Sequence, residues 1–506
     1  MQLLFSILFV ISRLAFLNPG NVFFDSKEYL TRLASGSLVT ALTSGHPPLH
    51  SGFVLTFWPF YQFLSLIGIN PVLPILLCQV LLSLLIVWLF YRTVSLLLNK
   101  EIAWRSMVVF TLIPIFWIVN EAVMMETTYL FYWILSLYFL TRYLVEKKQK
   151  TLYLIISSLS WVMAFLTHTV VIMWIPLFIL LAFTINKKRS VSVLSWGLLA
   201  LVTSSLVNAY LLSRTYSTDL YGGLYWLYSA KFGEHAWFQF TIETVFRYLR
   251  NWILPLGYNN SWILLLISIV GLFGWLLKDK KIFWIGVLWI VPSFVTNQWW
   301  DSLLYGRHSL IVSFALAIFA GGVLNKKSYR LFTGVLFVIS LSALYLLLKP
   351  IPYIETAKVA NTLPPGGLLI DSHFARPQTD GEYFGEIIFV DEPGWPAKNL
   401  SDRINSYLTS KKPVFITGQA LSEPYGLFSG PYVHPLSISY KYGYILSYLS
   451  QKYYFEKYID IDSDYNLCVY EIKEGSVNYP DIIRLDKSRK RIDWLDPLRI
   501  LSSGIL

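Results

Sequence analysis

Hydrophobic and polar positions alternate in long blocks over the first 350 residues of the chain. A helix needs ~20 apolar residues to cross about 30 Å of hydrocarbon, and about eleven blocks approach that length, although some are shorter. The blocks are Leu3–Leu17, Val72–Leu97, Met107–Val119, Thr127–Leu144, Leu152–Leu166, Val170–Ile185, Val191–Leu212, Trp262–Leu277, Ile282–Val295, Ser309–Leu324 and Leu331–Leu348. This pattern predicts an α-helical polytopic membrane protein with about eleven transmembrane helices.

Basic residues mark every second connection between these blocks. The clusters are Lys100/Arg105, Lys147/Lys148/Lys150, Lys187/Lys188/Arg189, Lys278/Lys280/Lys281 and Lys326/Lys327/Arg330. By the positive-inside rule these connections are cytoplasmic. The opposite connections are then extracytoplasmic, among them Asn18–His50, Arg214–Ser261 and Asn297–His308, as is the tail after Pro350. The first block resembles a signal peptide, but no small-residue cleavage site follows it, so we interpret it as a retained span.

One further apolar stretch, Phe53–Ile69, cannot be a transmembrane helix if all the basic connections are to lie on the cytoplasmic side. Pro59 interrupts it and Pro47-Pro48 precede it. Its Trp58 and Tyr61 suit the depth of lipid headgroups. We therefore expect a helix that lies in the outer interface, within a first extracytoplasmic loop of residues 18–70 that carries juxtamembrane helices.

The composition changes after residue 349. Short β-rich runs, GLLID, EIIFVD, PVFITG and LCVYEI, alternate with two helix-like stretches, LSDRINSYLTS and ILSYLSQKYYFEKY. Such alternation is typical of a small α/β domain. We therefore predict a membrane domain over residues 1–349 and a soluble extracytoplasmic α/β domain over residues 350–506.

Composition and charge narrow the class of protein. The chain of 506 residues is 55% hydrophobic and only 14% charged, whereas soluble domains carry about 25% charged residues. The net charge of +11 does not indicate nucleic acid as a partner, because much of the basic excess lies in short clusters between apolar blocks. Two cysteines, far apart in the sequence, do not indicate a disulfide framework.

Two acidic groups border the membrane on the predicted outer side. Asp25 follows the first block, with Glu28 and Tyr29 one helical turn further on. Glu126 opens the Thr127–Leu144 block, and Glu121 precedes it. Carboxylates at the membrane boundary are costly to desolvate and are functional by default. Two of them from separate elements form a site in which one deprotonates an acceptor and the other positions it. The alternative is that they are solvated or paired with Lys27 and Arg32.

Cationic and polar side chains gather on the same predicted side. Arg307 and His308, with Tyr305 nearby, stand where the Ser309–Leu324 block enters the membrane, and His168 joins two blocks at their outer turn. A guanidinium matches a phosphate well, and the alternative is snorkelling to headgroups. His46 and His50 flank Pro-Pro, but no cysteine joins them, so we predict no metal site.

Taken in order, these motifs resemble the GT-C glycosyltransferases of the protein O-mannosyltransferase and aminoarabinose-transferase type. The motifs are DSKEYL, GHPPLH, NEAVMMETTYLFYWILSLYFLTRY, AFLTHTVVIMWIPLFIL and GRHSLIVSFALAIFAG. The resemblance covers Leu3 to Leu348 and leaves the C-terminal domain uncovered. It implies a GT-C fold and a polyprenyl-phosphate sugar as donor, with its isoprenoid tail in the bilayer.

The resemblance also implies roles for single residues. Asp25 matches the family's first-loop aspartate, which activates the acceptor. The second acid of the family is commonly Asp, and Glu126 stands there in this chain. His168 occupies the place of a basic residue in the family's Thr-Lys or Thr-Arg turn, and Arg307 matches the Arg at the head of a late span. His46 opens the HPPL element.

The mechanism that follows is inverting transfer on the outer face of the cytoplasmic membrane. Asp25 takes the proton of an acceptor hydroxyl, while Arg307, with His168, His308 and Tyr305, stabilises the leaving phosphate. We expect no cofactor and no required divalent metal, because no Asp-x-Asp motif is needed to hold a nucleotide pyrophosphate. The acceptor is a protein, a lipid or a glycan, and the sequence does not choose among them.

Two other classes stay open from the residues alone. A transporter or lipid flippase accounts for the spans, but it predicts ionisable groups near the bilayer midplane and internal repeats. A non-catalytic membrane scaffold gives no reason for Asp25, Glu126 and Arg307 to converge.

Overall fold

A computed structural model describes most of the chain. The described residues are 2–17, 24–45, 49–120, 123–146, 150–232, 245, 248–249, 252–253, 256–257, 259–298, 310–347, 357–372, 379, 381–390, 397–421, 449, 451–462 and 467–475. The chain divides into two compact units. The helical unit holds Met1–Gly20 and Glu28–Leu341, and the sheet unit holds Asn21–Lys27 and Ser342–Leu506.

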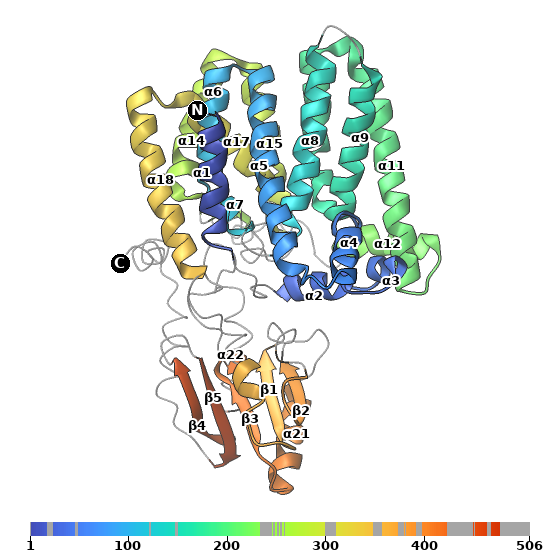
Figure 1. Cartoon of the computed structure of the whole chain (residues 1–506), viewed down its shortest axis with the longest axis vertical. Coiled ribbons are helices and arrows are strands. Elements are labelled where there is room, and N and C mark those ends of the chain that lie inside the picture. Colours follow the sequence, from blue (N-terminus) through green and yellow to red (C-terminus); the bar gives the residue numbers. More distant parts are fainter. Residues whose placement is uncertain are drawn as a thin grey trace. The chain divides into compact units, whose positions relative to one another are not determined.

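Long helices make up the helical unit (Figure 1). In chain order the described helices are α1 (Gln2–Leu14), α2 (Phe24–Leu33), α3 (Leu38–Thr43), α4 (Ser51–Leu66), α5 (Val72–Leu97), α6 (Lys100–Thr111), α7 (Pro114–Ile118), α8 (Glu126–Val145), α9 (Thr151–Thr167), η1 (Thr169–Trp174), α10 (Ile175–Ile185), η2 (Lys187–Arg189), α11 (Ser190–Thr215), α12 (Leu220–Phe232), α14 (Trp262–Lys278), α15 (Lys280–Ile290), α16 (Pro292–Gln298), α17 (Leu310–Val323) and α18 (Lys326–Leu347). Helix α2 lies across the division between the two units.

Helix α17 lies at the centre of the bundle. All of its residues from Leu310 to Gly321 are buried, as expected for a helix that is apolar on every side. Its Phe314 ring stacks on Phe110 of α6 at 4.3 Å between centroids and on Trp133 of α8 at 5.7 Å. Each such aromatic pair is worth about 0.5–1.5 kcal/mol beyond the area it buries. The core of the bundle is therefore aromatic and joins helices that are far apart in the sequence.

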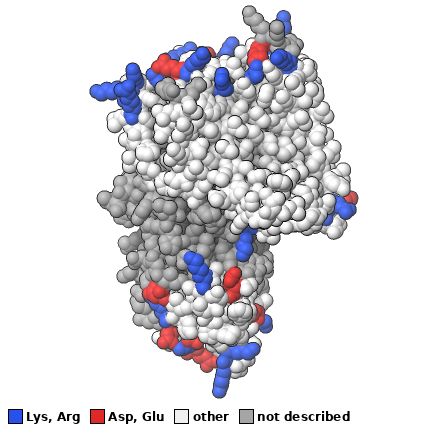
Figure 2. Space-filling view, in the orientation of Figure 1, with Lys and Arg blue, Asp and Glu red and all other residues white. Residues whose placement is uncertain are grey.

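The helical unit is membrane-integral by the character of its helices and by its fold. Two described helices, Val72–Leu97 and Lys187–Thr215, are long and apolar enough to cross a bilayer, and further apolar helices are shorter. Figure 2 shows charged side chains gathered along one end of the unit and flanks almost without them. The predicted number of about eleven spans is not confirmed, because helices end or change type beside prolines within three of the predicted blocks, at Pro114, Pro176 and Pro292.

The basic connections lie together at one end of the bundle (Figures 1 and 2). Two arginines there tie helix ends together. Arg105 Nη1 donates to the Leu324 carbonyl at 2.6 Å, and Arg189 Nη1 donates to the carbonyls of Tyr143 and of Glu146, the latter at 2.9 Å. The last carbonyls of a helix have no partner within it, so these arginines satisfy them. That this end faces the cytoplasm stays a prediction.

Helix α4 lies at the other end, where α8 begins and α9 ends. Trp58 Nε1 and Gln62 Nε2 both donate to the Ser35 carbonyl just after α2. The helix predicted over Phe53–Ile69 is confirmed as α4, which continues through Pro59, and its place in the membrane interface stays a prediction. Burial of Phe57 and Leu64, on either side of the proline, outweighs the backbone hydrogen bond that proline removes.

The sheet unit contains a five-stranded mixed sheet in the order β2-β1-β3-β5-β4. The strands are β1 (Leu368–Ser372), β2 (Glu386–Val390), β3 (Val414–Thr417), β4 (Tyr453–Asp462) and β5 (Leu467–Glu474), with helices α21 (Ala397–Thr409) and α22 (Gly418–Leu421). Strand β1 runs parallel to both β2 and β3, and β5 runs antiparallel to β3 and β4.

The four predicted strands are confirmed as β1, β2, β3 and β5, and the first helix-like stretch is α21. The second helix-like stretch, residues 445–458, is a wrong prediction over the residues that form β4. Tyr453 and Phe455 are buried while Tyr454 and Glu456 are exposed. This period of two, together with pairing to β5, overrides local helix propensity.

A glycine sets the distance between α4 and α9, which gives a first prediction. A Cβ on Gly52 would lie 2.3 Å from Thr167 Oγ1 and 2.6 Å from the Met163 carbonyl. Overpacking of this kind costs about 1–3 kcal/mol, so Gly52→Ala lowers the melting temperature of the purified protein. Gly197→Ala is the matched control, since Gly197 also lies within a helix and its Cβ would meet nothing within 4 Å. Equal melting temperatures for both variants contradict the close approach.

A second prediction concerns acid stability of the sheet unit. Arg403 of α21 donates to Glu386 of β2 at 2.9 Å, and Tyr407 donates to it at 2.7 Å. Hydrogen bonding by Arg403 holds the pKa of Glu386 below its ordinary value. A lowered carboxyl pKa stabilises the fold above the ordinary value of about 4.3, and that contribution is lost as the pH falls through the lowered pKa.

The measurement is the reaction rate of Cys468, which is 3% exposed in β5, with a disulfide reagent that is active in acid. Above about pH 4.3 Cys468 reacts faster in Arg403→Gln than in the wild type. Below that pH the wild-type reaction rate rises toward the rate of the variant. A rate difference between the two proteins that stays constant across this pH range contradicts the assignment.

Candidate functional site

Glu126 is the first residue of α8, and its side chain is fully buried. A carboxylate removed from water costs several kcal/mol unless dipoles or charges compensate it. The N-terminus of a helix carries a partial positive charge that favours an anion there. The position of Glu126 therefore supplies part of the compensation that its burial requires.

The backbone on which Glu126 sits is held by buried polar side chains. Gln79 of α5 donates to the carbonyl of Met124. Thr127 Oγ1 donates to Asn120 Oδ1 at 2.9 Å, and Asn120 donates in turn to the Phe116 carbonyl. Gln79, Asn120 and Thr127 are all fully buried. Bonds from α5 and from the end of α7 thus fix where α8 begins.

A row of four rings links separate elements beside Glu126. Tyr129 lies one turn after Glu126 on α8, and its ring centroid is 5.4 Å from that of His168. His168 is 5.6 Å from His50, and His50 is 5.7 Å from Tyr29 of α2. Residues one turn apart on a helix are neighbours on one face. The row therefore runs from the Glu126 face of α8 to α2.

Hydrogen bonds assign the protons on the two imidazoles. His50 Nδ1 lies 2.8 Å from the Thr167 carbonyl, so that nitrogen carries a proton. His168 Nδ1 accepts from the Val170 backbone N–H at 3.1 Å, so in the neutral ring the proton is on Nε2. Fixing one nitrogen of a histidine in this way fixes the role of the other. Each ring thus has a defined tautomer.

The backbone at His50 is strained. Its φ is +46° and its ψ is +37°, the left-handed region that residues other than glycine rarely adopt. Such residues persist where the surroundings hold them, and they cluster at functional sites. The bond to the Thr167 carbonyl at the end of α9 holds this one, so His50 is a candidate site residue on backbone grounds as well.

Helix α2 carries the acidic residues of the first loop. Asp25 lies in its first turn. Arg32 Nε donates to the Ala41 carbonyl at 2.9 Å, and Nη1 lies 3.9 Å from Glu28 Oε1. Burial lowers the pKa of Arg32, and Glu28 opposes that shift. The bond to Ala41 joins α2 to α3, and the Glu28–Arg32 pair lies within α2, so Glu28 has a structural partner.

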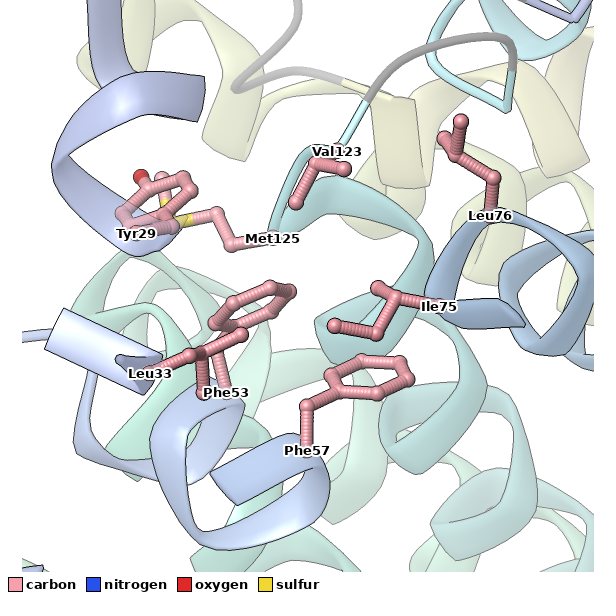
Figure 3. Packing of buried hydrophobic residues seen from close by; sticks show 8 residues of the cluster. All are labelled: Tyr29, Leu33, Phe53, Phe57, Ile75, Leu76, Val123 and Met125. Carbon is pink, nitrogen blue, oxygen red and sulfur yellow. The ribbon is translucent and has the colours of Figure 1, made fainter. Parts of the chain in front are cut away.

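An apolar cluster supports this end of the bundle. Figure 3 shows side chains from α2, α4, α5 and the segment before α8 directed toward one another. The cluster consists of Tyr29, Leu33, Phe53, Phe57, Ile75, Leu76, Val123 and Met125. Because Val123 and Met125 stand just before Glu126, burial of this cluster fixes the carboxylate relative to α2 and α4.

Comparisons with known proteins show which family model and which fold this chain resembles. The family model of dolichyl-phosphate-mannose-protein mannosyltransferases matches residues 46–212, the part that holds Glu126, His168 and His50. Comparison with curated protein sequences gives no match.

Solved structures extend the likeness over most of the chain. ArnT from Cupriavidus metallidurans in the apo state is 12% identical, with a TM-score of 0.50, over 92% of this chain and 97% of ArnT. The structure of the same protein bound to undecaprenyl phosphate gives a TM-score of 0.51, with the same identity and coverage. The chain has the fold of a GT-C glycosyltransferase. The predicted resemblance to GT-C polyprenyl-phosphate-sugar transferases is thus confirmed.

Within the GT-C fold the sequence-predicted residues separate into two groups. His168 and Tyr29 belong to one row of rings, Glu126 lies one turn before Tyr129 of that row, and Glu28 lies one residue before Tyr29 on α2. The side chain of Asp25 and the whole of His46, Glu121, Tyr305, Arg307 and His308 lie outside the described residues. Their roles stay predictions.

Sequence reasoning considered His50 only as a metal ligand and did not single out Tyr129, Gln79 or Asn120. The signal for His50 is its place beside Pro-Pro and before a helix. Tyr129 is one turn after Glu126, so helical spacing identifies it. No local signal identifies Gln79, because its partner Met124 is 45 residues away. Among the described residues no group of three or more His, Cys, Asp or Glu side chains forms a metal-binding arrangement.

Proposed function

We propose that the chain moves a sugar from a polyprenyl-phosphate donor to a hydroxyl acceptor at the end of the bundle where Glu126 lies. The GT-C fold and the family model support a glycosyltransferase. The ArnT structure with undecaprenyl phosphate supports a lipid-linked donor. We place the reaction on the outer face of the cytoplasmic membrane, because the basic connections lie at the opposite end.

The chemistry is a displacement at the anomeric carbon. The acceptor oxygen forms a bond to that carbon as the bond from the carbon to the donor phosphate oxygen breaks, with inversion. The acceptor proton passes to a carboxylate, and the polyprenyl phosphate leaves with an additional negative charge. A site for this reaction needs a base on one face of the sugar and cationic or N–H donors on the other.

The chain offers residues for both tasks. We assign Asp25 as the base, Glu126 as the carboxylate that orients the acceptor hydroxyl, and Arg307 as the main phosphate ligand. His168 carries its proton on Nε2 in the neutral ring, so it is a donor to an anion without a permanent charge. His308 and Tyr305 add further donors next to Arg307 in the sequence.

The observation that carries the proposal is the fully buried carboxylate of Glu126 beside the row from Tyr129 to Tyr29. Gln79 and Asn120 fix the backbone from which this desolvated acid projects, which a non-catalytic scaffold does not require. Buried acids near titratable side chains are typical of catalytic sites.

Removing the charge of Glu126 tests this directly. Membranes containing Glu126→Gln transfer radiolabelled sugar from polyprenyl phosphate at least about 10²-fold more slowly than wild type. The amide keeps the shape of the side chain, so expression and gel-filtration profile stay unchanged. The class of labelled product, protein, lipid or glycan, identifies the acceptor in the same experiment.

Glu101 provides the matched control. It also lies in the first turn of a helix, α6, but its side chain is 73% exposed and pairs with Arg105. Glu101→Gln keeps the wild-type rate. Wild-type transfer by Glu126→Gln would exclude this carboxylate from the reaction, and absence of sugar transfer in wild-type membranes with every donor tried favours a transporter.

We also propose that transfer requires no divalent metal. A polyprenyl monophosphate has no pyrophosphate for a metal to bridge, and protein cations serve the single phosphate. Wild-type membranes therefore keep their transfer rate in excess EDTA, measured beside a metal-dependent nucleotide-sugar transferase that EDTA stops. Loss of transfer that Mg²⁺ or Mn²⁺ restores contradicts this part of the proposal.

A further inference from the structure

A cavity of about 220 Å³ lies between α8, α9, α10 and α11. Its walls are almost wholly apolar and include Leu140, Leu154, Trp161, Phe178 and Leu198. Apolar cavities of roughly 150 Å³ stay dry and take up hydrocarbon. Hydrocarbon is therefore the material that fits this space.

The polar side chains in the walls do not call for a polar ligand. Ser157 Oγ lies 2.9 Å from the Ser136 carbonyl, to which it donates, and the two serine hydroxyls are 3.2 Å apart. The hydroxyls of Ser136 and Ser157 are thus hydrogen-bonded within the protein. Recognition of a head group must therefore occur outside the cavity.

The α11 wall is the side on which the cavity meets the surroundings. Leu194 and Leu198 line it and are 38% and 62% exposed. Gly197 lies between them, and a Cβ there would meet nothing within 4 Å. In a membrane-integral bundle an exposed apolar helix face meets acyl chains. A chain can therefore enter the cavity past Gly197.

The end of the cavity nearest the basic connections carries positive charge. Lys150 precedes α9, four residues before Leu154, and Lys187 and Lys188 precede α11. Four helical residues rise about 6 Å, so Lys150 stands about one turn from the cavity wall, while Lys187 and Lys188 are six and five residues before Val193, which lines it. All three lysines are exposed. Glu146, four residues before Lys150, is paired with Arg142 at 2.5 Å.

We propose that this is a binding site for one anionic phospholipid, with an acyl chain in the cavity and its phosphate at Lys150, Lys187 and Lys188. The apolar walls accept the chain, and the three cations complement a negative head group. Arg189 holds the rim in place by donating to the carbonyls at the end of α8. The site does not depend on the proposed transfer reaction.

The site is distinct from the candidate transfer site. Ser136 lies ten residues after Glu126 on α8, which is about 15 Å of helix, and Leu140 is a further turn away. The lipid phosphate and the donor phosphate are thus at opposite ends of the bundle. A phospholipid of the leaflet at the basic end reaches the cavity directly.

Native mass spectrometry of the purified full-length protein tests the proposal. The probes are phosphatidylglycerol and phosphatidylcholine with identical acyl chains. Wild type retains one phosphatidylglycerol in preference to phosphatidylcholine. Gly197→Phe fills the cavity and loses that lipid. The triple substitution Lys150→Gln, Lys187→Gln and Lys188→Gln reduces the preference at least about fivefold, the contribution expected from a single lysine near an anionic head group.

Matched controls keep the test decisive. Gly274→Phe on α14 also places a ring where a Cβ meets nothing within 4 Å, and Lys326→Gln with Lys327→Gln removes exposed lysines of another connection. Both retain the lipid and the preference. Equal retention of the two probes by wild type, retention of the lipid by Gly197→Phe, or one-for-one displacement by undecaprenyl phosphate overturns the proposal. The lysine variants change only exposed side chains, so they test it even where Gly197→Phe does not fold.

Discussion

The burial of one carboxylate is the constraint on which this end of the bundle depends. Glu126 lies at the start of α8 with no exposed surface, and a desolvated acid is tolerated only where the surroundings are fixed to compensate it. The helix N-terminus, the apolar cluster around Phe53 and the hydrogen bonds of Gln79 and Asn120 all act on the same few residues. The row of rings from Tyr129 through His168 and His50 to Tyr29 begins one helical turn after the acid. Removal of any of these supports leaves the carboxylate position undefined, so the polar and apolar parts of the site form one structural unit.

The two ends of the helical unit are specialised in different ways. At the basic end, Arg105 and Arg189 donate to the last carbonyls of neighbouring helices, and these bonds connect the helices through neutral backbone acceptors. At the other end the connections are longer and form helices of their own, α2, α3 and α4. Hydrocarbon excludes charge from the middle of the bundle, where aromatic rings around Phe314 fill the space instead. Polar chemistry is thereby restricted to the ends, with a lipid-linked donor proposed for one and a phospholipid for the other.

The sequence was informative about the site to the extent that the site lies at span boundaries. Glu126 and His168 were identifiable because each stands where an apolar block begins or ends, and a titratable residue there is unusual. His50 was underestimated, since its significance lies in a left-handed backbone and a bond to Thr167, 117 residues away. Gln79 was not identifiable, because a glutamine inside an apolar block has no local pattern. Prolines within predicted blocks were the less predictable feature, because α4 continues through Pro59 as expected, whereas helices end or change type beside Pro114 and Pro292.

By itself the amino-acid sequence determined the class of protein, the clustering of basic residues in alternate connections, four of the five strands and the likeness to GT-C glycosyltransferases. The first three follow from hydropathy, charge and short-range periodicity, which are properties of neighbouring residues, whereas the likeness rests on short motifs whose order resembles a known family. Only the tertiary structure decided that residues 453–462 form a strand, because pairing with β5 supplies the energy. It alone placed Tyr29, His50, Tyr129 and His168 in one row, because their contacts depend on how four separate elements pack. Packing across such distances is a sum of many small contacts, and no single stretch of sequence encodes it.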